Sequence, residues 1–537
     1  MKRPHIIILN PDEMRADAVA HLGNPASCTP VLDRLQETEA VSFSNAFCQN
    51  PVCVPSRCSF FTGRYPHTRG HRTMTHLLHP GESSLFSELK DVGYYVWMNG
   101  RNDLVAGQYE GLDYKHADEI YYYDESVPVG TKPFRLPGAP QEKKDRYMHV
   151  QGVVEGQNRL ETKDLNDTKA AIDRILHPVD PDKPLCLFLG WLNPHCPYVT
   201  SPEYRNRIDA SKIPERVRFN ETTGKSRIIE KLRELTGGST WTDEQFEEMR
   251  AIYLAQCSFI DDLTGMVIDA LKEAGIYDDC AIFFLSDHGD FTGDFDLPEK
   301  SQNTFEHCLT RVPFLVKPPK GEQVDPGICD GLTELVDFYA TVMDYAGVTP
   351  DHTQFGRSVR GMLHDRSAAG KEYVFSEGGR RPDEPHCDEW HNKAGQGPKP
   401  TDDYWAKKTA QKDNEAHIKG TMIFDGRYKY VKRMNHRDEF YDLETDPGER
   451  HNIIETADPA VLARLKDAMF DWYQETCDDV PYKLDSRATS GSNWANIRGF
   501  VPPELEETVH DMLRNKDGKE AAAEVMKFLA EKLADKQ

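Results

Sequence analysis

The sequence predicts an α/β protein with a large, mixed but mostly parallel sheet sandwiched by helices, and a smaller C-terminal α+β subdomain of antiparallel strands and a helix. Three observations predict this class. Short apolar runs end abruptly in polar residues, segments of helical periodicity lie between these runs, and the composition changes after about residue 371. Strands that alternate with helices along a chain are typical of a layered α/β architecture.

Four apolar runs are typical of buried strands because they are short and continuous. The run "HIIILNPDE" ends at Asp12, "YYVWMNGRND" at Asp103, "LCLFLGWLNPH" at His195, and "AIFFLSDHGD" at Asp287 and His288. In open α/β sheets, ligands bind beyond the carboxyl ends of the strands. We therefore expect these distant side chains to meet in one crevice.

Helical segments separate the strands. Pro30 suits the first turn of a helix over "PVLDRLQETEA", the segment "SSLFSELKDVG" ends at a glycine, and residues 242–275 carry apolar side chains at helical spacing. Together with the strands, these helices predict one large α/β domain over residues 1–371.

The C-terminal third has a different amino-acid composition. Residues 372–418 are rich in glycine, proline and charge and are predicted to form a long loop. Residues 419–479 are predicted to form antiparallel strands, with turns at 425–426 and 446–448, followed by the helix "PAVLARLKDAMFDWYQE". Residues 480–537 form a tail that ends in an amphipathic helix, which we expect to pack or to oligomerise.

The composition limits the classes of binding partner and predicts the cellular compartment. The chain has 537 residues, 65 of them basic and 89 acidic, and its net charge of -24 argues against nucleic acid or an anionic membrane as the main partner. No run is apolar for long enough to cross a bilayer, and the N-terminal apolar run is too short for a signal peptide. The 12 cysteines are scattered without CxxC pairs, which is typical of reduced thiols, so we expect a cytoplasmic protein.

The segment "NPVCVPSRCSFFTGRYPH" poses a specific question about Cys53. Pro55 suits the first turn of a helix, so Cys53 is expected at a helix N-terminus, where unpaired N–H groups favour an anion or a lowered thiol pKa. The residue types alone equally allow a second interpretation, in which Cys53 is one more small buried thiol.

A family resemblance favours the first interpretation. "CVPSRCSFFTGR" resembles the signature of the formylglycine-dependent sulfatases of the alkaline-phosphatase-like superfamily. "PDEMRAD" and "SDHGD" are similar to the two pairs of metal ligands of that family, and "NPHCPY" to its Pro-His-x-Pro-Phe motif. "PEKSQNTFEHCLTRVPFLVK" is similar to its segment with a substrate-binding lysine, and "EFYDLETDPGERHNI" to its C-terminal signature. These six motifs follow the family order and span most of the chain.

The resemblance implies a metal site and a modified residue. Cys53 would be oxidised to formylglycine by a maturation enzyme, and it would complete a divalent-ion site formed by Asp12, Glu13, Asp287 and His288. Calcium is the first expectation because oxygen ligands dominate, with magnesium or manganese as alternatives. The ion would also allow several carboxylates to share one site.

The resemblance also implies catalytic roles for cationic residues. Arg57 would hold the metal-bound group derived from Cys53, and Arg101, Lys300 and His195 would add positive charge around the developing anion. The hydrated aldehyde would attack sulfur, and either His195 or Lys300 would protonate the leaving alcohol.

Three positions depart from the family pattern. The family usually shows Gly-Lys-x-His where this chain reads "GRND", so that Arg101 replaces a lysine and Asp103 a histidine. We hypothesise that Asp103 acts as a base or binds a hydroxyl or ammonium group of the substrate, or that His71 or His76 takes the missing role. Glu13 stands where the family has a second aspartate, and it reaches the ion or leaves that position to water.

The sequence therefore predicts a sulfuric ester hydrolase that acts on a small sulfated molecule, with a saccharide among the candidates. Two alternatives stay open: a phosphonate monoester or phosphodiester hydrolase of the same superfamily, and a metal-binding homologue without catalysis. Substrate recognition is expected from the loop with His386, Trp390 and His391, although a merely solvated loop is equally compatible. Oligomeric state is not predicted, and homo-oligomerisation stays open.

Overall fold

The computed structural model describes residues 3–123, 150–154, 162–389, 404–480, 489–514 and 518–534. The chain divides into two units, Met1–Asp479 and Val480–Gln537. All the predicted site residues belong to the first unit.

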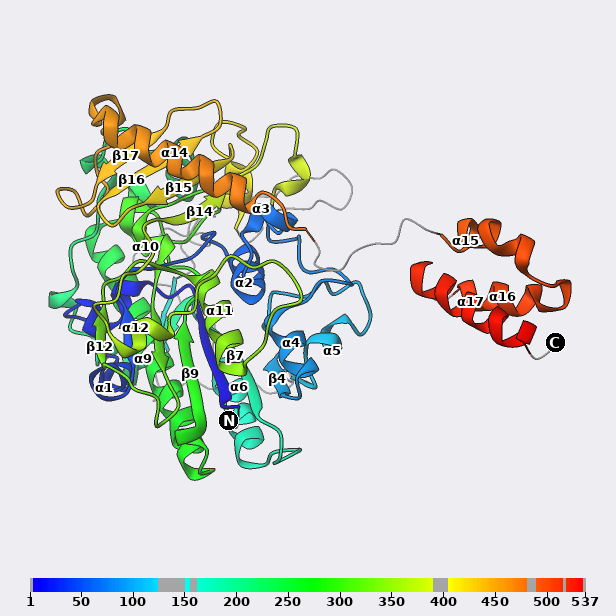
Figure 1. Ribbon diagram of the computed structural model, residues 1–537. Helices are drawn as coiled ribbons and strands as arrows, with labels where there is room; N and C mark the ends of the chain where they lie inside the picture. The colour runs from blue at the N-terminus through cyan, green and yellow to red at the C-terminus, as the bar shows by residue number, and fades with distance from the viewer. Residues whose placement is uncertain are drawn as a thin grey trace. The chain divides into compact units, whose positions relative to one another are not determined.

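The first unit is built on one large sheet. Its eight strands are β1 (His5–Asp12), β2 (Val41–Phe43), β4 (Tyr95–Asn99), β5 (Glu119–Tyr121), β7 (Leu185–Pro194), β9 (Cys280–Leu285), β11 (Phe314–Lys317) and β12 (Gly327–Cys329). They follow the order β12-β2-β11-β9-β1-β7-β4-β5. Strand β1 pairs in parallel with β7 and β9, whereas β11 runs antiparallel to β9 and β2. The predicted mixed, mostly parallel sheet is confirmed (Figure 1).

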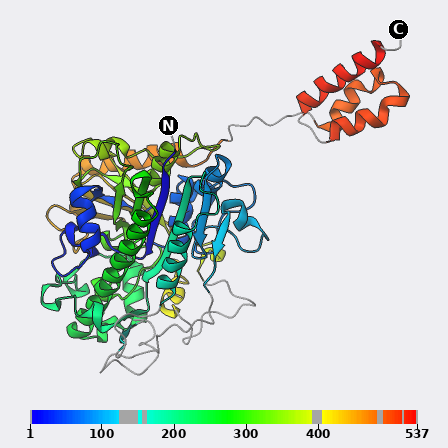
Figure 2. The same cartoon turned by 90° about the horizontal axis from the view of Figure 1, so that it is seen from below.

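Helices cover both faces of this sheet (Figure 2). Along β1, Ile7 and Leu9 belong to one hydrophobic core, and Ile6 and Ile8 to the other. Successive side chains of a strand point to opposite faces, so a continuous apolar run is buried on both sides. The first core contains α1 (Pro30–Thr38), α6 (Lys163–Leu176) and α9 (Asp243–Glu273), and the second contains α2 (Cys53–Thr62), α4 (Leu85–Asp91) and α11 (Leu335–Ala346).

The predicted helices are confirmed with their expected ends. Pro30 is the first residue of α1, and Gly93 follows shortly after α4. Helix α9 begins after Thr242, whose side chain accepts a hydrogen bond from the N–H of Gln245. By length and composition α9 alone among the described helices could cross a membrane, but 83% of its most apolar window is buried within the protein. It is therefore a core helix of the sandwich.

A second, four-stranded sheet lies in the C-terminal part of the first unit. It comprises β14 (Val374–Gly378), β15 (Gly420–Phe424), β16 (Tyr428–Arg433) and β17 (Glu439–Asp442), all antiparallel, followed by α14 (Pro459–Thr476). The predicted strands and helix of this region are present. The expected loop of residues 372–418, however, begins with β14 and contains α13 (Trp405–Ala410). Only two apolar residues mark β14, and Phe375 becomes buried because it stacks on Trp472 of α14, with ring centroids 4.4 Å apart.

The remaining elements are short. In the first unit they are β3 (Ala46–Phe47), β6 (Val150–Val153), β8 (Tyr198–Thr200), β10 (Arg311–Val312), β13 (Thr333–Glu334), α3 (Pro66–Arg69), α5 (Leu112–His116), α7 (Pro202–Arg205), α8 (Arg227–Thr236), α10 (His307–Thr310) and α12 (Arg360–His364). The second unit contains α15 (Ser490–Ile497), α16 (Glu506–Arg514) and α17 (Gly518–Ala534), which share a core that includes Val509 and Val525.

We predict that Phe283→Ala destabilises the first unit strongly. Phe283 is fully buried in β9 and packs against Phe338 and Tyr345, with ring centroids 5.2 and 6.1 Å away. Removing the ring leaves a cavity, so the free energy of unfolding should fall by about 3–5 kcal/mol in chemical denaturation. Phe470→Ala is the matched control, because Phe470 is 63% exposed, and it should change stability by no more than about 0.5 kcal/mol. Equal effects of the two variants would contradict this assignment of the core.

Candidate active site

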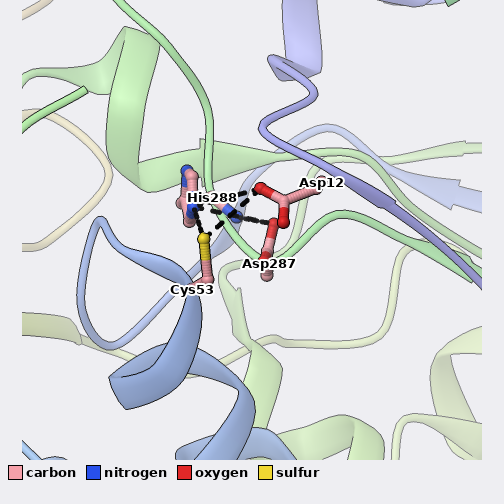
Figure 3. A group of neighbouring side chains, drawn as sticks. All are labelled: Asp12, Cys53, Asp287 and His288. Atoms are coloured by element: carbon pink, nitrogen blue, oxygen red, sulfur yellow. Dashed lines mark hydrogen bonds and ion pairs between the residues drawn. The ribbon is translucent and has the colours of Figure 1, made fainter. Parts of the chain in front are cut away.

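Four side chains from three segments meet at the carboxyl end of the sheet (Figure 3). Asp12 ends β1, Cys53 begins α2, and Asp287 and His288 follow β9. Their possible ligand atoms all lie within 4.8 Å of one another, and no side chain of the four is more than 3% exposed. We call these residues the four-residue group. Two of the four strand ends that the sequence pattern singled out, those of β1 and β9, thus converge in this group.

The thiol of Cys53 lies between an acidic and a basic neighbour. It donates to Asp12 Oδ1 at 3.4 Å, and its sulfur lies 3.3 Å from His288 Nε2. The other ring nitrogen of His288, Nδ1, lies 2.9 Å from the carbonyl oxygen of Gly289. Because that carbonyl can only accept, Nδ1 carries the hydrogen and Nε2 offers its lone pair to the four-residue group.

Helix α2 places Cys53 and contacts the segment that follows β9. Cys53 is its first residue, as predicted, and the hydroxyl of Ser56 donates to the carbonyl oxygen of Asp287 at 2.6 Å. The expected lowering of the thiol pKa is not found. Burial, reinforced by the charge of Asp12, raises the pKa of Cys53 well above its ordinary value. An unmodified Cys53 is therefore a protonated thiol and a poor nucleophile at neutral pH.

Arg57 joins the two carboxylates of the group. Its Nε donates to Asp287 Oδ2 at 2.8 Å, its Nη2 to Asp12 Oδ2 at 3.0 Å, and its Nη1 to the carbonyl oxygen of Arg101 at 2.9 Å. Arg101 also donates to Asp12 Oδ2 through its own guanidinium. Although burial alone would raise it, the positive charges of Arg101 and Arg57 hold the pKa of Asp12 well below its usual range.

A second cluster surrounds Lys300. Its ammonium donates to Glu13 Oε2 at 2.9 Å, lies 3.2 Å from Glu299 Oε1, and lies 2.5 Å from His195 Nε2. The contacts with Glu13 and His195 are hydrogen bonds, whereas the contact with Glu299 is an ion pair. His195 Nδ1 lies 2.5 Å from the carbonyl oxygen of Cys196, and this leaves Nε2 to accept from Lys300.

The pKa values of His195 and Lys300 shift in opposite directions. Burial and the charge of Lys300 lower the pKa of His195 well below its ordinary value. Burial opposes the charge of Lys300, but Glu13 and Glu299 raise its pKa well above the ordinary value. The proton therefore resides on Lys300, and His195 is neutral.

Glu13 lies in this second cluster and not in the four-residue group. Its backbone has a φ of 71°, a left-handed conformation that is costly for a residue with a side chain, and its N–H donates to Asp287 Oδ1 at 3.1 Å. This turn directs the carboxylate to Lys300, while the backbone supports Asp287. Metal binding by Glu13 stays a prediction that this conformation does not itself support.

Asp103 lies at the more exposed side of the site. Its side chain is 33% exposed, and Oδ2 lies 3.9 Å from Arg57 Nε, so the expected electrostatic cost of this carboxylate is offset by a neighbouring cation. The proposed substitutes lie elsewhere. His71 contacts the carbonyl oxygen of His76 and the carboxylate of Glu82, and His76 Nδ1 contacts the hydroxyl of Thr73 at 2.5 Å.

The candidate recognition loop is described only in part. The ring of His386 lies in a short 3₁₀ helix, 6.2 Å from that of His76, whereas Trp390 and His391 lie outside the described residues. A later part of the segment approaches the second cluster. Lys407 of α13 lies 3.7 Å from Glu299 and 3.4 Å from Glu389.

Sequence reasoning missed several members of the second cluster. Glu299 directly precedes Lys300 in "LPEKSQN", which was an available signal. Cys196 and Lys407 had no such signal, because a cysteine beside a candidate histidine and a lysine in a polar loop are common without function.

The four-residue group is suited to one divalent cation. Its donors are hard or borderline and come from three segments: two carboxylates, one imidazole nitrogen and the group at position 53. All four side chains are buried, which excludes competing solvent. Among the residues that the structure describes, Arg57 and Arg101 are the arginines that pair with these two buried carboxylates.

The chain is similar to several known proteins. The family model described as Sulfatase matches residues 4–348. Arylsulfatase K of Danio rerio is 26% identical over 403 residues, which cover 70% of this chain and 71% of that protein. Two solved structures have similar folds. The phosphonate monoester hydrolase of Agrobacterium radiobacter has a TM-score of 0.69 at 21% identity and covers 89% of this chain and 97% of that chain. A protein in complex with its substrate D-glucosamine-2-N,6-O-disulfate has a TM-score of 0.65 at 17% identity and covers 88% and 98%.

We predict that Arg57→Met destabilises the metal-free protein by about 3–5 kcal/mol, because it leaves two buried carboxylates with one cation fewer. Added Ca²⁺ should recover part of this loss if the cation takes over the compensation. Chemical denaturation with and without chelator measures both effects. Arg72→Met is the control, since Arg72 pairs with Glu384 in a partly exposed position, and it should cost about 1 kcal/mol or less. A loss for Arg57→Met no larger than that of the control would contradict the bridging role.

Proposed function

The chain belongs to the sulfatase family and is a sulfatase hydrolase. We propose that it cleaves the sulfate ester of a small molecule or saccharide through a formylglycine made from Cys53. One observation carries the proposal. Position 53 begins a helix at the centre of the four-residue group, within 3.4 Å of both Asp12 and His288, and Arg101 and Lys300 lie close by. Because burial and the charge of Asp12 raise its pKa, the unmodified thiol is a poor nucleophile, and the proposal assigns the attack to the modified residue.

We propose that Asp12, Asp287, His288 and the modified residue 53 hold one divalent cation, with Ca²⁺ the first candidate and Mg²⁺ or Mn²⁺ the alternatives. When present, the hydrated formylglycine and the cation supply a hydroxyl nucleophile for sulfur and a Lewis acid that stabilises negative charge.

Residues of the chain itself prepare the site for an anion. Arg57 fixes the orientation of Asp12 and Asp287 through two charge-assisted hydrogen bonds. Arg101 and Lys300 provide a local positive charge for the sulfate group, despite the net charge of -24 of the whole chain. Lys300 holds a proton that can pass to the leaving alcohol. His195 accepts a hydrogen bond from Lys300 and so positions the ammonium group.

A phosphonate monoester or phosphodiester hydrolase is the second candidate. The fold likeness to a phosphonate monoester hydrolase favours it, and the same cations suit a phosphoryl group. The two candidates differ in the charge of the transferred group, which the arrangement of these residues does not discriminate.

Mass spectrometry and parallel assays test the proposed function. Protein co-expressed with a formylglycine-generating enzyme is digested, and the peptide that contains Cys53 is expected to show an aldehyde in place of the thiol. The same preparation is assayed on 4-nitrophenyl sulfate, bis(4-nitrophenyl) phosphate and a phosphonate monoester, with Cys53→Ala as the control. We expect the highest kcat/KM on the sulfate ester and no turnover by the control. Turnover that survives in Cys53→Ala would overturn the proposal, and preference for the phosphorus esters would establish the second candidate.

We further predict that Asp103→Asn lowers kcat/KM at least about 10-fold on the true substrate, because a carboxylate beside the reacting group acts as a base or as a substrate ligand. A fall confined to kcat indicates the base, and a rise confined to KM indicates the ligand. Asp91→Asn, on the exposed end of α4, serves as the control and should leave both parameters unchanged. If Asp103→Asn behaves like this control, both roles are wrong.

A further inference from the structure

A cavity of about 450 Å³ lies apart from the candidate active site. Among the described residues that line it, none belongs to the four-residue group or to the cluster around Lys300. Its walls come from the loop after β1, from α9, from the region around β10 and from the turn after β17. We call it the arginine cavity, because Arg15, Arg250, Arg311 and Arg450 all line it.

Two of these arginines have no counter-ion in direct contact within the described chain. Arg250 of α9 is only 9% exposed, and Arg311 of β10 is partly buried. Within the described part of the chain, neither guanidinium has a hydrogen bond or an ion pair with another residue. Burial lowers the pKa of both, and Asp294 and Asp17 act on them only through longer-range attraction. Uncompensated charge of this kind is costly, and each guanidinium keeps five unused N–H donors.

The carboxylates of the cavity make no direct contact with Arg250 or Arg311 in the described chain, and four of them lie beside another cation. The pairs are Asp17 with Arg15 at 2.7 Å, Asp294 with Arg15 at 2.8 Å, Glu306 with Lys225 at 2.8 Å, and Glu449 with Lys429. Glu215 also lines the cavity, but it is exposed to solvent. Arg450 is partly exposed and lies 3.7 Å from Glu221 and 3.9 Å from Asp446.

We propose that the arginine cavity binds a small oxyanion with two negative charges: inorganic sulfate or phosphate, or the sulfate or phosphate group of a small ester. Guanidinium groups match the oxygen edges of such anions through paired hydrogen bonds. Arg250 and Arg311 bind the anion, and the volume of the cavity leaves room for a small group esterified to it. The site is separate from the proposed reaction, and nothing in it requires Cys53 or a metal.

The test measures oxyanion binding to the full chain by isothermal titration calorimetry, in chloride buffer of constant ionic strength. Inorganic sulfate, inorganic phosphate and glucose 6-phosphate serve as separate probes. Sulfate can also bind at the active site, so the double variant Arg250→Met/Arg311→Met is compared with Arg101→Met/Lys300→Met. We expect the first variant to lose one binding equivalent, or at least 10-fold in affinity, and the second to retain that equivalent. Tighter binding of glucose 6-phosphate than of the inorganic ions would identify an ester as the ligand.

Thermal denaturation provides a second, independent readout. In chloride alone, Arg250→Met/Arg311→Met should unfold at the same or a higher temperature than the wild type, because it removes two uncompensated buried charges. Sulfate or phosphate should raise the Tm of the wild type and of Arg101→Met/Lys300→Met, but not that of the cavity variant.

Arg250→Lys keeps the charge and loses the paired geometry, so it should bind the anion with an intermediate affinity. This variant keeps the test decisive if the double variant does not fold. Equal affinity, stoichiometry and oxyanion-dependent Tm in the wild type and the cavity variants would overturn the proposal, as would a Tm shift that chloride reproduces at matched ionic strength.

Discussion

The need to compensate two buried carboxylates determines the geometry of the active site. Asp12 and Asp287 end or follow neighbouring parallel strands, so the sheet itself brings their charges together. Arg57 is the only side chain that donates to both, at 3.0 and 2.8 Å, among the residues the structure describes. Because Arg57 lies one turn along α2 from Cys53, the same ion pairs that neutralise the carboxylates also orient the helix that presents Cys53.

In the cluster around Lys300, buried charges of opposite sign also compensate each other. Lys300 donates hydrogen bonds to Glu13 and His195, and Glu299 lies between Lys300 and Lys407 of α13. Alternating charges therefore run from Glu13 to Lys407. The position of Lys300 is thus set by residues of several segments that are distant in the sequence.

The arginine cavity differs from the active site in how its charges are balanced. In the candidate active site the buried cations Arg57 and Lys300 each have a carboxylate in direct contact. In the arginine cavity the buried carboxylates are paired with other cations, and Arg250 and Arg311 remain without a contact partner in the described chain. The first arrangement suits chemistry on a bound group, whereas the second suits simple retention of an anion.

The sequence by itself determined the sheet, the main helices and the convergence of Asp12 and Asp287, because apolar period and helix signals are local properties of the chain, whereas the family resemblance added Cys53. Tertiary structure alone decided where individual side chains point and which partners they meet. The φ of Glu13 turns its carboxylate to Lys300, burial raises the pKa of Cys53, and the stacking of Phe375 on Trp472 makes a strand of a segment with a loop-like composition. These outcomes depend on residues that are distant in the sequence, whose contacts and charges no local pattern records.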